Sequence, residues 1–255
     1  MAYTPQEWMV VAAAREIRDG EVVFVGMRLP LLAFAVAKCR HAPRAVGLFE
    51  NGVIRDTPPA ELLYTMGDNP NVHQAVSCTS MLTVMGLLQR GEVDAGFIGG
   101  AEVDRFGNLN TSYIGPPERP RVKLPGSGGG VDIACLAKRL LIIMPHEKKR
   151  FVERVSFITS PGYGDGPGWR ERHGLPRGGP DVIISTLGVF RFDPRTREAY
   201  LASYRPGVTP EEVCAHTGWA LRVAPDCAPG PVPTEEELAL VRRFDPDGFW
   251  TRPRA

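Results

Sequence analysis

The chain has 255 residues, 43% of them apolar, and its 30 basic and 29 acidic residues leave a formal net charge of +1. It has no run of five or more like charges, which argues against a nucleic-acid partner. No apolar run reaches the ~18 to 20 residues of a membrane span and the start lacks the features of a signal peptide, so we expect a cytoplasmic protein with no membrane partner.

The first fifth of the chain alternates between helical and strand-like patterns. Thr4 and Glu7 form a capping box with Pro5 at the first helical position, which predicts a helix over residues 8–17. The segments that follow are predicted as a strand (21–25), a helix (30–39) and a strand (44–49). This order predicts a parallel strand–helix–strand unit.

The same alternation continues to the end of the chain. Further helices are predicted at 79–89 and 131–138, and further strands at 93–99, 139–144, 182–186, 189–192 and 199–203. Capping boxes at Thr209 and Thr234 open two C-terminal helices, and the proline-rich run 224–233 is interpreted as a connector. We therefore expect one α/β domain over residues 1–255, with an open, mostly parallel sheet and helices on both faces.

Glu50 is the candidate catalytic residue. It leaves the apolar run 44–49 and is followed at once by Asn51 and Gly52. A carboxylate in this place lies at the carboxyl end of a strand, where ligands bind in open α/β sheets. The alternative is a solvated residue of a hairpin turn, since Asn-Gly is a common hairpin dipeptide.

A glycine-rich loop stands just before the predicted helix at 131–138. It is formed by Gly126, Ser127, Gly128 and Gly129. Consecutive glycines let backbone N–H groups converge on an anion or a polarised carbonyl, so this loop could form half of an oxyanion hole. The alternative is a flexible turn into the helix.

Residues 160–180 contain seven glycines and four prolines, a density at which we expect neither helix nor strand. We predict an ordered loop at a site or subunit contact, with disorder as the alternative. The segment 104–108 is predicted as a hairpin turn that could bring Asn108 near a site. The cysteines and histidines are scattered without metal-ligand spacing, so no metal is expected.

These motifs together resemble the B (beta) subunit of class I coenzyme A transferases. The residues that carry the likeness are Glu50 to Gly52, 98–104, Gly107 with Asn108, and 126–129, and their order and spacing match as well. The likeness is strongest to the glutaconate CoA-transferase B subunit, above all over residues 144–151 and 159–176. It covers nearly the whole chain and fades past about Gly218.

The resemblance implies an active site shared with a separate A (alpha) subunit in a hetero-oligomer, such as a heterotetramer or larger. Glu50 matches the family's nucleophile, and the backbone N–H groups of Gly128 and Gly129 would face the thioester carbonyl. Residues implied in binding substrate or CoA are Asn51, Gly52, Gly126, Ser127 and Asn108. Coenzyme A would enter as an acyl-CoA substrate, with no cofactor bound permanently.

The chemistry of such a transfer agrees with these roles. Moving CoA between two acids without hydrolysis needs a carboxylate that forms an acyl anhydride and then a glutamyl-CoA thioester. One difference bears on the acid: the glutaconate type has serine after the catalytic Glu, whereas Asn51 follows the broader 3-oxoacid type. We expect a dicarboxylate or oxo acid as substrate.

Two other functions fit parts of the pattern. A CoA-ester hydrolase of the ring-opening type would keep the fold and use water as acceptor, without a glutamyl-CoA stage. A scaffold that only binds CoA esters or a partner protein would not need Glu50 at all. A covalent CoA adduct on Glu50 would exclude both.

Overall fold

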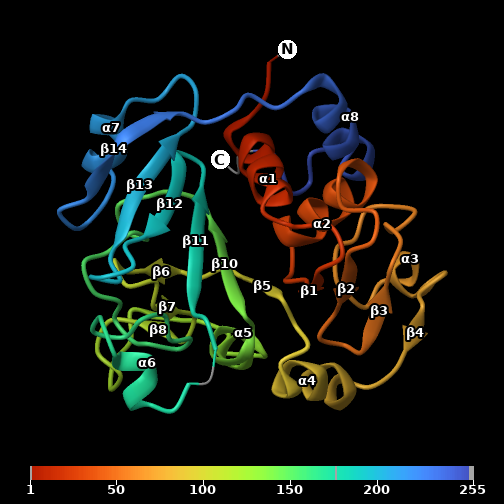
Figure 1. The fold of residues 1–255 in the computed structure, drawn as a ribbon, viewed down its shortest axis with the longest axis horizontal. Helices are drawn as coiled ribbons and strands as arrows, with labels where there is room; N and C mark the ends of the chain where they lie inside the picture. The colour runs from red at the N-terminus through yellow and green to blue at the C-terminus, as the bar shows by residue number, and fades with distance from the viewer. Residues whose placement is uncertain (1, 176, 253–255) are drawn as a thin grey trace. The chain divides into compact units, whose positions relative to one another are not determined.

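The computed structural model describes residues 2–175 and 177–252. These form two compact units (Figure 1). The first holds the described residues of Met1–Phe97 and Val232–Ala255, and the second holds those of Ile98–Pro231. Each unit has its own strands and its own buried core, and the single domain over 1–255 stays a prediction.

The described part of the first unit contains a sheet with the strand order β5-β1-β2-β3-β4. The strands are β1 (Val22–Phe24), β2 (Val46–Leu48), β3 (Val53–Arg55), β4 (Ser77–Cys78) and β5 (Ala95–Ile98). β1 runs parallel to both β2 and β5, whereas β3 is antiparallel to β2 and to β4. The unit is therefore parallel in its interior and antiparallel toward the β4 edge.

Helices accompany this sheet, and all of them except α3 were predicted from the sequence. They are α1 (Pro5–Arg15), α2 (Leu29–Arg40), α3 (Asn69–Val72), α4 (Met81–Arg90) and α8 (Glu235–Phe244). α2 joins the parallel strands β1 and β2, which confirms the predicted strand–helix–strand unit. Its Phe34 ring lies so close to Gly47 of β2 that a Cβ there would be 2.7 Å from the ring, so α2 packs directly on the sheet.

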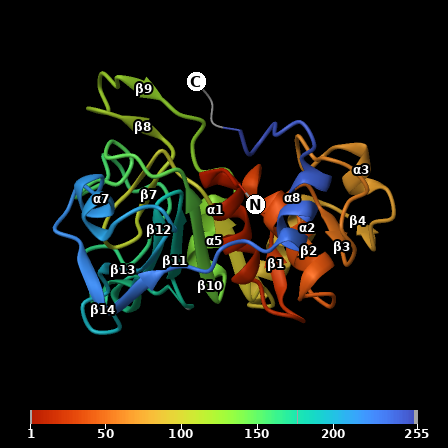
Figure 2. The same cartoon turned by 90° about the horizontal axis from the view of Figure 1, so that it is seen from above.

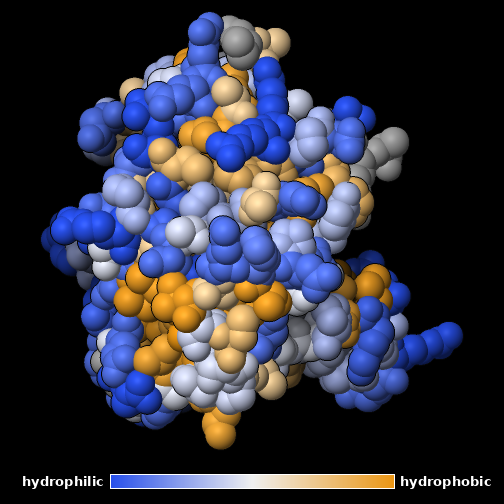
Figure 3. All heavy atoms as spheres, turned by 90° about the vertical axis from the view of Figure 1, so that its right-hand side faces the viewer, coloured by the Kyte–Doolittle hydropathy of each residue, from blue (hydrophilic) through white to orange (hydrophobic). Residues whose placement is uncertain are grey.

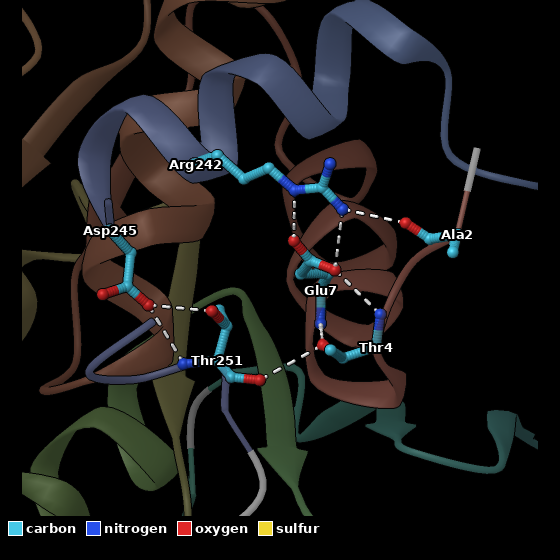
Figure 4. Close-up of polar contacts among 6 residues, drawn as sticks. All are labelled: Ala2, Thr4, Glu7, Arg242, Asp245 and Thr251. Carbon is cyan, nitrogen blue, oxygen red and sulfur yellow. Dashed lines mark hydrogen bonds and ion pairs between the residues drawn. The ribbon is translucent and has the colours of Figure 1, made fainter. Parts of the chain in front are cut away.

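The helices α1 and α8 bind each other through their capping boxes. Each box has a Thr at the N-cap and a Glu three residues on, and that Glu also pairs with the last turn of the other helix. Glu7 of α1 accepts from Arg242 at 2.8 Å, and Glu237 of α8 accepts from Arg15 at 2.6 Å. Figure 4 shows the first of these pairs, and Figures 1 and 2 both place α1, α2 and α8 side by side.

The described part of the second unit has a sheet in the order β14-β13-β12-β11-β10. Its strands are β10 (Arg139–Met144), β11 (Pro180–Ser185), β12 (Gly188–Phe192), β13 (Ala199–Tyr204) and β14 (Arg222–Pro229). β10 and β11 are parallel, β12 is antiparallel to both neighbours, and β13 and β14 are parallel. These strands and the covering helices confirm the predicted α/β class with an open sheet.

The interpretation of residues 224–233 as a connector is wrong for most of its length. Residues up to Pro229 belong to β14, where Ser203 pairs with Ala228 and Tyr204 with Pro229. β14 is the last strand of its sheet. An edge strand tolerates prolines because the missing N–H can face away from the neighbouring strand.

Shorter elements complete the second unit. They are β6 (Glu102–Val103), β7 (Leu109–Asn110), β8 (Tyr113–Ile114), β9 (Val122–Lys123), α5 (Gly130–Leu136), α6 (Trp169–Arg172) and α7 (Pro210–Ala215). β6 and β7 are antiparallel, which confirms the predicted turn at 104–108. The expectation of no helix in 160–180 is wrong, because α6 forms one short turn there; residue 176 of that loop lies outside the described residues.

The core of the second unit contains a stack of rings around a buried histidine. His146 lies flat on Phe151, with ring centroids 3.7 Å apart, and Phe151 in turn stacks near Trp219. The His146 ring nitrogens lie 3.0 Å from the Ser185 hydroxyl and 3.2 Å from the Thr217 hydroxyl. Burial lowers the pKa of His146 to about 3, so this ring is neutral in the folded protein. Within the described residues no helix is both long and apolar enough to span a bilayer.

Candidate functional site

Glu50 lies in the tight turn between β2 and β3. The Phe49 N–H donates to the Val53 carbonyl at 2.9 Å, and the Gly52 N–H donates to the Phe49 carbonyl at 2.9 Å. The turn is thus a hairpin, and Glu50 stands just past the carboxyl end of β2, half-buried. The backbone around Glu50 is therefore a hairpin turn, as the alternative interpretation expected. Glu50 also lies at the carboxyl end of a strand, as the catalytic interpretation expected.

Gly52 can be only glycine in this turn. Its φ is +99°, and a Cβ would lie 2.2 Å from the Thr79 carbonyl oxygen. That carbonyl belongs to the segment leading into α4, and the Thr79 N–H donates to the Gly52 carbonyl at 2.9 Å. The backbone before α4 therefore closes over the turn and fixes the direction in which Glu50 leaves it.

Asn51 uses its amide to bind a neighbouring loop. Its Nδ2 donates to the Met66 carbonyl at 2.9 Å, and its Oδ1 accepts weakly from the Val53 N–H at 3.4 Å. The same Met66 carbonyl accepts from Asn71 at 2.6 Å. Asn51 is exposed, so contact with a substrate stays a prediction, but its first role in the structure is to tie the Glu50 turn to the loop 56–73.

The glycine loop 126–129 lies in the second unit and leads into α5. The Gly126 N–H donates to the Thr111 carbonyl at 2.8 Å, and the Gly130 N–H to the Ser127 carbonyl at 2.9 Å. Among the described residues, no acceptor takes the N–H of Gly128, which is exposed, with a φ of +47°. Of the three predicted glycines, Gly126 donates its N–H within the fold, Gly128 is exposed and Gly129 is buried, so the oxyanion role of Gly128 and Gly129 stays a prediction.

Asn108 holds the glycine-rich loop 160–180 in place. Its Oδ1 accepts from the N–H groups of Gly162 and Gly164 at 2.9 and 3.1 Å, and its Nδ2 donates to the Gly164 carbonyl at 2.7 Å. Nδ2 also donates to Asp104 at 3.0 Å, and Asn108 is only 1% exposed. The amide is fully used inside the unit, so a contact of Asn108 with substrate stays a prediction, whereas its hold on the loop is direct.

Two buried groups that sequence reasoning missed complete this arrangement. Burial raises the pKa of Asp104, although hydrogen bonds from Asn108 and from the Phe106 N–H oppose that rise. Arg170, 4% exposed, donates to the carbonyls of Gly162 and Arg177 and to those of Ala134 and Cys135 in α5. The described residues of 160–180 are thus tied to the helix that follows the glycine loop, while a place for them at a site or subunit contact stays a prediction.

The second unit contains a cavity of about 660 Å³ beside this network. Charged and aromatic side chains line it, including Arg105 and Phe106 of the β6–β7 turn and Trp169 of α6. Within the described residues, no three His, Cys, Asp or Glu side chains gather closely enough to hold a metal ion.

Comparisons with known proteins place this geometry in a family. Residues 6–216 match the family model described as coenzyme A transferase. The chain is 40% identical to the B subunit of 3-oxoadipate CoA-transferase from Pseudomonas knackmussii, with 96% of this chain and 94% of that protein covered. It is 37% identical to the B subunit of glutaconate CoA-transferase from Acidaminococcus fermentans, over 87% of this chain and 85% of that one.

A solved structure agrees with these relatives. The crystal structure of glutaconate coenzyme A-transferase from Acidaminococcus fermentans superimposes with a TM-score of 0.92 at 34% identity, covering 99% of this chain and 98% of that chain. Both the sequence and the fold match over nearly the full length. The chain therefore belongs to the coenzyme A transferase family, among its B subunits.

Proposed function

We propose that this chain, together with a separate A subunit, transfers CoA from an acyl-CoA to a free carboxylic acid through a thioester on Glu50. The observation that carries the proposal is the Glu50 turn, in which the backbone of Thr79 and the glycine at position 52 allow one path for the chain. A nucleophile needs this restraint because small errors in its position cost large factors in rate. Membership in the family supports the same role.

The reaction proceeds in four steps. A carboxylate oxygen of Glu50 attacks the thioester carbonyl, and the C–S bond breaks to release the CoA thiolate and leave an acyl anhydride. The thiolate then attacks the Glu50 carbonyl of that anhydride, which frees the donor acid and leaves glutamyl-CoA. The acceptor carboxylate then attacks glutamyl-CoA, which releases the CoA thiolate and forms a second anhydride. The thiolate attacks the acceptor's carbonyl in that anhydride, which gives the new acyl-CoA and regenerates the Glu50 carboxylate.

Negative charge develops on the carbonyl oxygen in each addition step. Backbone donors stabilise such a charge best when they are fixed in advance. We assign this role to the N–H groups of Gly128 and Gly129 in the second unit, with a further donor from the A subunit. Gly126 and Ser127 hold the shape of the loop, as the Gly126 and Gly130 hydrogen bonds indicate.

The acid is expected to be a dicarboxylate or an oxo acid. The two relatives reported above are named for 3-oxoadipate and glutaconate, both of which carry two carboxylates. Coenzyme A serves as a substrate and returns to solution at the end of each turnover.

The A subunit is expected to contact the surface between α3 and the first turn of α4. Exposed apolar side chains there are Val72 (42% exposed), Val76 (61%), Met81 (53%) and Leu82 (82%). Figure 3 shows hydrophobic side chains gathered in the lower part of the face it draws, the side on which Figure 1 places α3 and β4. The Thr79 N–H donates to the Gly52 carbonyl, so the segment that leads into α4 lies against the Glu50 turn.

The decisive experiment is the intact mass of the chain, copurified with its A subunit and incubated with acyl-CoA esters, followed by peptide mapping. We expect a CoA-sized adduct on Glu50 that disappears when an acceptor acid is added. Turnover of CoA esters without any adduct would instead establish the hydrolase.

The matched variants are Glu50→Gln and Glu92→Gln. Loss of the nucleophile should lower activity by about 10³-fold or more with assembly intact. Glu92 lies on the surface of the same unit in an exposed pair with Arg90, so Glu92→Gln should leave activity unchanged. Full activity of the Glu50→Gln complex would reduce the chain to a binding scaffold.

A further inference from the structure

Arg55, the last residue of β3, is a buried cation at the base of the Glu50 hairpin. It is 1% exposed. Its guanidinium donates to five carbonyl oxygens and one hydroxyl, all in the segment 57–73, which follows β3 and includes α3: Thr57 O (3.2 Å), Pro58 O (3.1 Å), Pro70 O (3.2 Å), Asn71 O (2.6 Å), His73 O (2.7 Å) and Thr57 Oγ1 (3.3 Å).

In the described part of the chain no carboxylate forms an ion pair with Arg55, and burial lowers its pKa while the charge of Asp56 opposes that change. A buried charge is costly unless its hydrogen bonds are complete. Here the carbonyls come from both ends of the loop 57–73, so the bonds that satisfy Arg55 also clamp those two ends onto β3.

The clamp continues to the residue beside the nucleophile. The amide of Asn71, whose carbonyl Arg55 binds, donates to the Met66 carbonyl at 2.6 Å. Asn51 donates to that same carbonyl at 2.9 Å. Two amides from different parts of the unit therefore meet on one acceptor, and one of them adjoins Glu50.

We propose that Arg55 is a positioning residue for the nucleophile: it fixes the loop 57–73, whose Met66 carbonyl holds Asn51 and thereby the Glu50 turn. The inference rests on the proposed role of Glu50. Lysine cannot make the same set of bonds, since its ammonium group has three donors on one nitrogen, whereas Arg55 makes six hydrogen bonds from three nitrogens.

The test is a double-mutant cycle in the complex reconstituted with its A subunit, using Arg55→Lys, Asn51→Ala and the double variant. The turnover rate kcat is divided by the number of Glu50 residues that form the CoA adduct at the end of the reaction. A loss of folded protein lowers the number of such sites, whereas a misplaced carboxylate lowers the rate at each one. We expect each single variant to lose roughly 10- to 100-fold in kcat per site, with KM for the acyl-CoA nearly unchanged.

The double variant decides whether Arg55 acts through Asn51. Its kcat per site should lie within about threefold of the slower single variant, because both substitutions break one path. Effects that multiply in the double variant, or an Arg55→Lys complex with wild-type kcat, would overturn the proposal. If Arg55→Lys does not fold, Asn71→Ala takes its place in the cycle, since it breaks the link between Arg55 and the Met66 carbonyl. In that case wild-type kcat in Asn71→Ala, or effects that multiply with Asn51→Ala, would overturn the proposal.

Two controls separate the possible failures. Arg242→Gln breaks the Glu7 pair on α8, away from this network, and should lower stability without changing kcat per site. Glu50→Gln tests the proposed function itself. If that variant still forms the adduct, the proposed nucleophile is wrong; if it does not, while Arg55→Lys keeps wild-type kcat, only the positioning role is wrong.

Discussion

Gly52 is the residue on which the conformation of the Glu50 turn depends most directly. Two separate constraints act on it: a φ of +99°, which disfavours any residue with a Cβ, and the Thr79 carbonyl, which a Cβ would meet at 2.2 Å. The second constraint is invisible in the sequence, because Thr79 is brought to the turn by the path of the chain. Asn-Gly alone indicates a turn and no more.

Substituting Gly52 by alanine should therefore lower the free energy of unfolding by more than a positive φ alone would. Gly20 offers the matched control, since its φ is +85° and nothing lies within 4 Å of the position that a Cβ would take. We expect Gly20→Ala to lower the free energy of unfolding by about 1 kcal/mol and Gly52→Ala by about 3 kcal/mol or more. Urea unfolding of the two variants measures the difference. Equal losses of unfolding free energy would show that the backbone at Thr79 can move aside at little cost.

The pairing of α1 with α8 joins the two ends of the described chain within the first unit. Burial would raise the pKa of Glu7, but hydrogen bonds from Arg242 and Thr4 outweigh it and hold the pKa below its ordinary value of 4.5. Glu237 behaves in the same way with Arg15 and Thr234. Nearby, Asp245 accepts from the Thr251 N–H and hydroxyl, so the segment after α8 is also held (Figure 4).

Removing Arg242 should destabilise the first unit. Arg242→Ala leaves the Glu7 carboxylate, whose side chain is 7% exposed, without its guanidinium, which we expect to cost about 1 to 3 kcal/mol of unfolding free energy. The control Arg90→Ala breaks the pair with Glu92, where both side chains are more than half exposed and solvent screens the charges, so it should change stability far less than Arg242→Ala does. Thermal and urea unfolding measure both variants. Equal losses of stability in Arg242→Ala and Arg90→Ala would contradict this account.

The first turn of α4 offers a separate test of the partner surface. Leu82 is 82% exposed and its burial by an A subunit would remove apolar area from water. Leu82→Asp should weaken assembly at least tenfold without lowering the stability of the isolated chain. Val232, 53% exposed but outside this surface, provides the control Val232→Asp, and titration of each variant with the A subunit compares them.

His146 in the second unit and the pair Glu7 and Glu237 in the first each link stability to pH. In the second unit the folded protein keeps His146 neutral down to about pH 3, whereas the unfolded chain binds a proton below about pH 6.5. The unfolded state thus holds more protons in this window, so stability is full above pH 6.5 and falls as the pH drops toward 3. In the first unit Glu7 and Glu237 contribute stability that is present above pH 4.5 and lost below it.

The contribution of His146 to stability should therefore begin to fall between pH 6.5 and 5, above the range in which Glu7 and Glu237 titrate. The slope from one buried His rises across this window toward about 1.4 kcal/mol per pH unit, as the unfolded chain becomes fully protonated at that His. His146→Gln cannot titrate and should abolish most of this slope, even though it lowers stability at pH 7. Urea unfolding at pH 7 and pH 5.5 measures both proteins, and an unchanged slope in the variant would exclude His146 as the cause.

Features that depend on neighbouring residues could be predicted from the amino-acid sequence. The capping boxes at Thr4 and Thr234 begin α1 and α8, the apolar periods place β1, α2 and β2, and Glu50 follows the end of a strand. The motifs around Glu50 and the glycine loop also indicated the family correctly. Each of these signals is contained in a short stretch of chain, where capping, turn and periodicity rules apply.

The distant groups that hold those features in place became visible only in the folded chain. Asn108 meets Gly162 and Gly164 across 54 and 56 residues, and Arg55 reaches the far end of a loop up to 18 residues away. β14 was missed because its prolines are allowed only by its place at the sheet edge. A buried polar group must form hydrogen bonds with groups that the folded chain brings near it. Those partners are distant in the sequence, so local periodicity does not predict them.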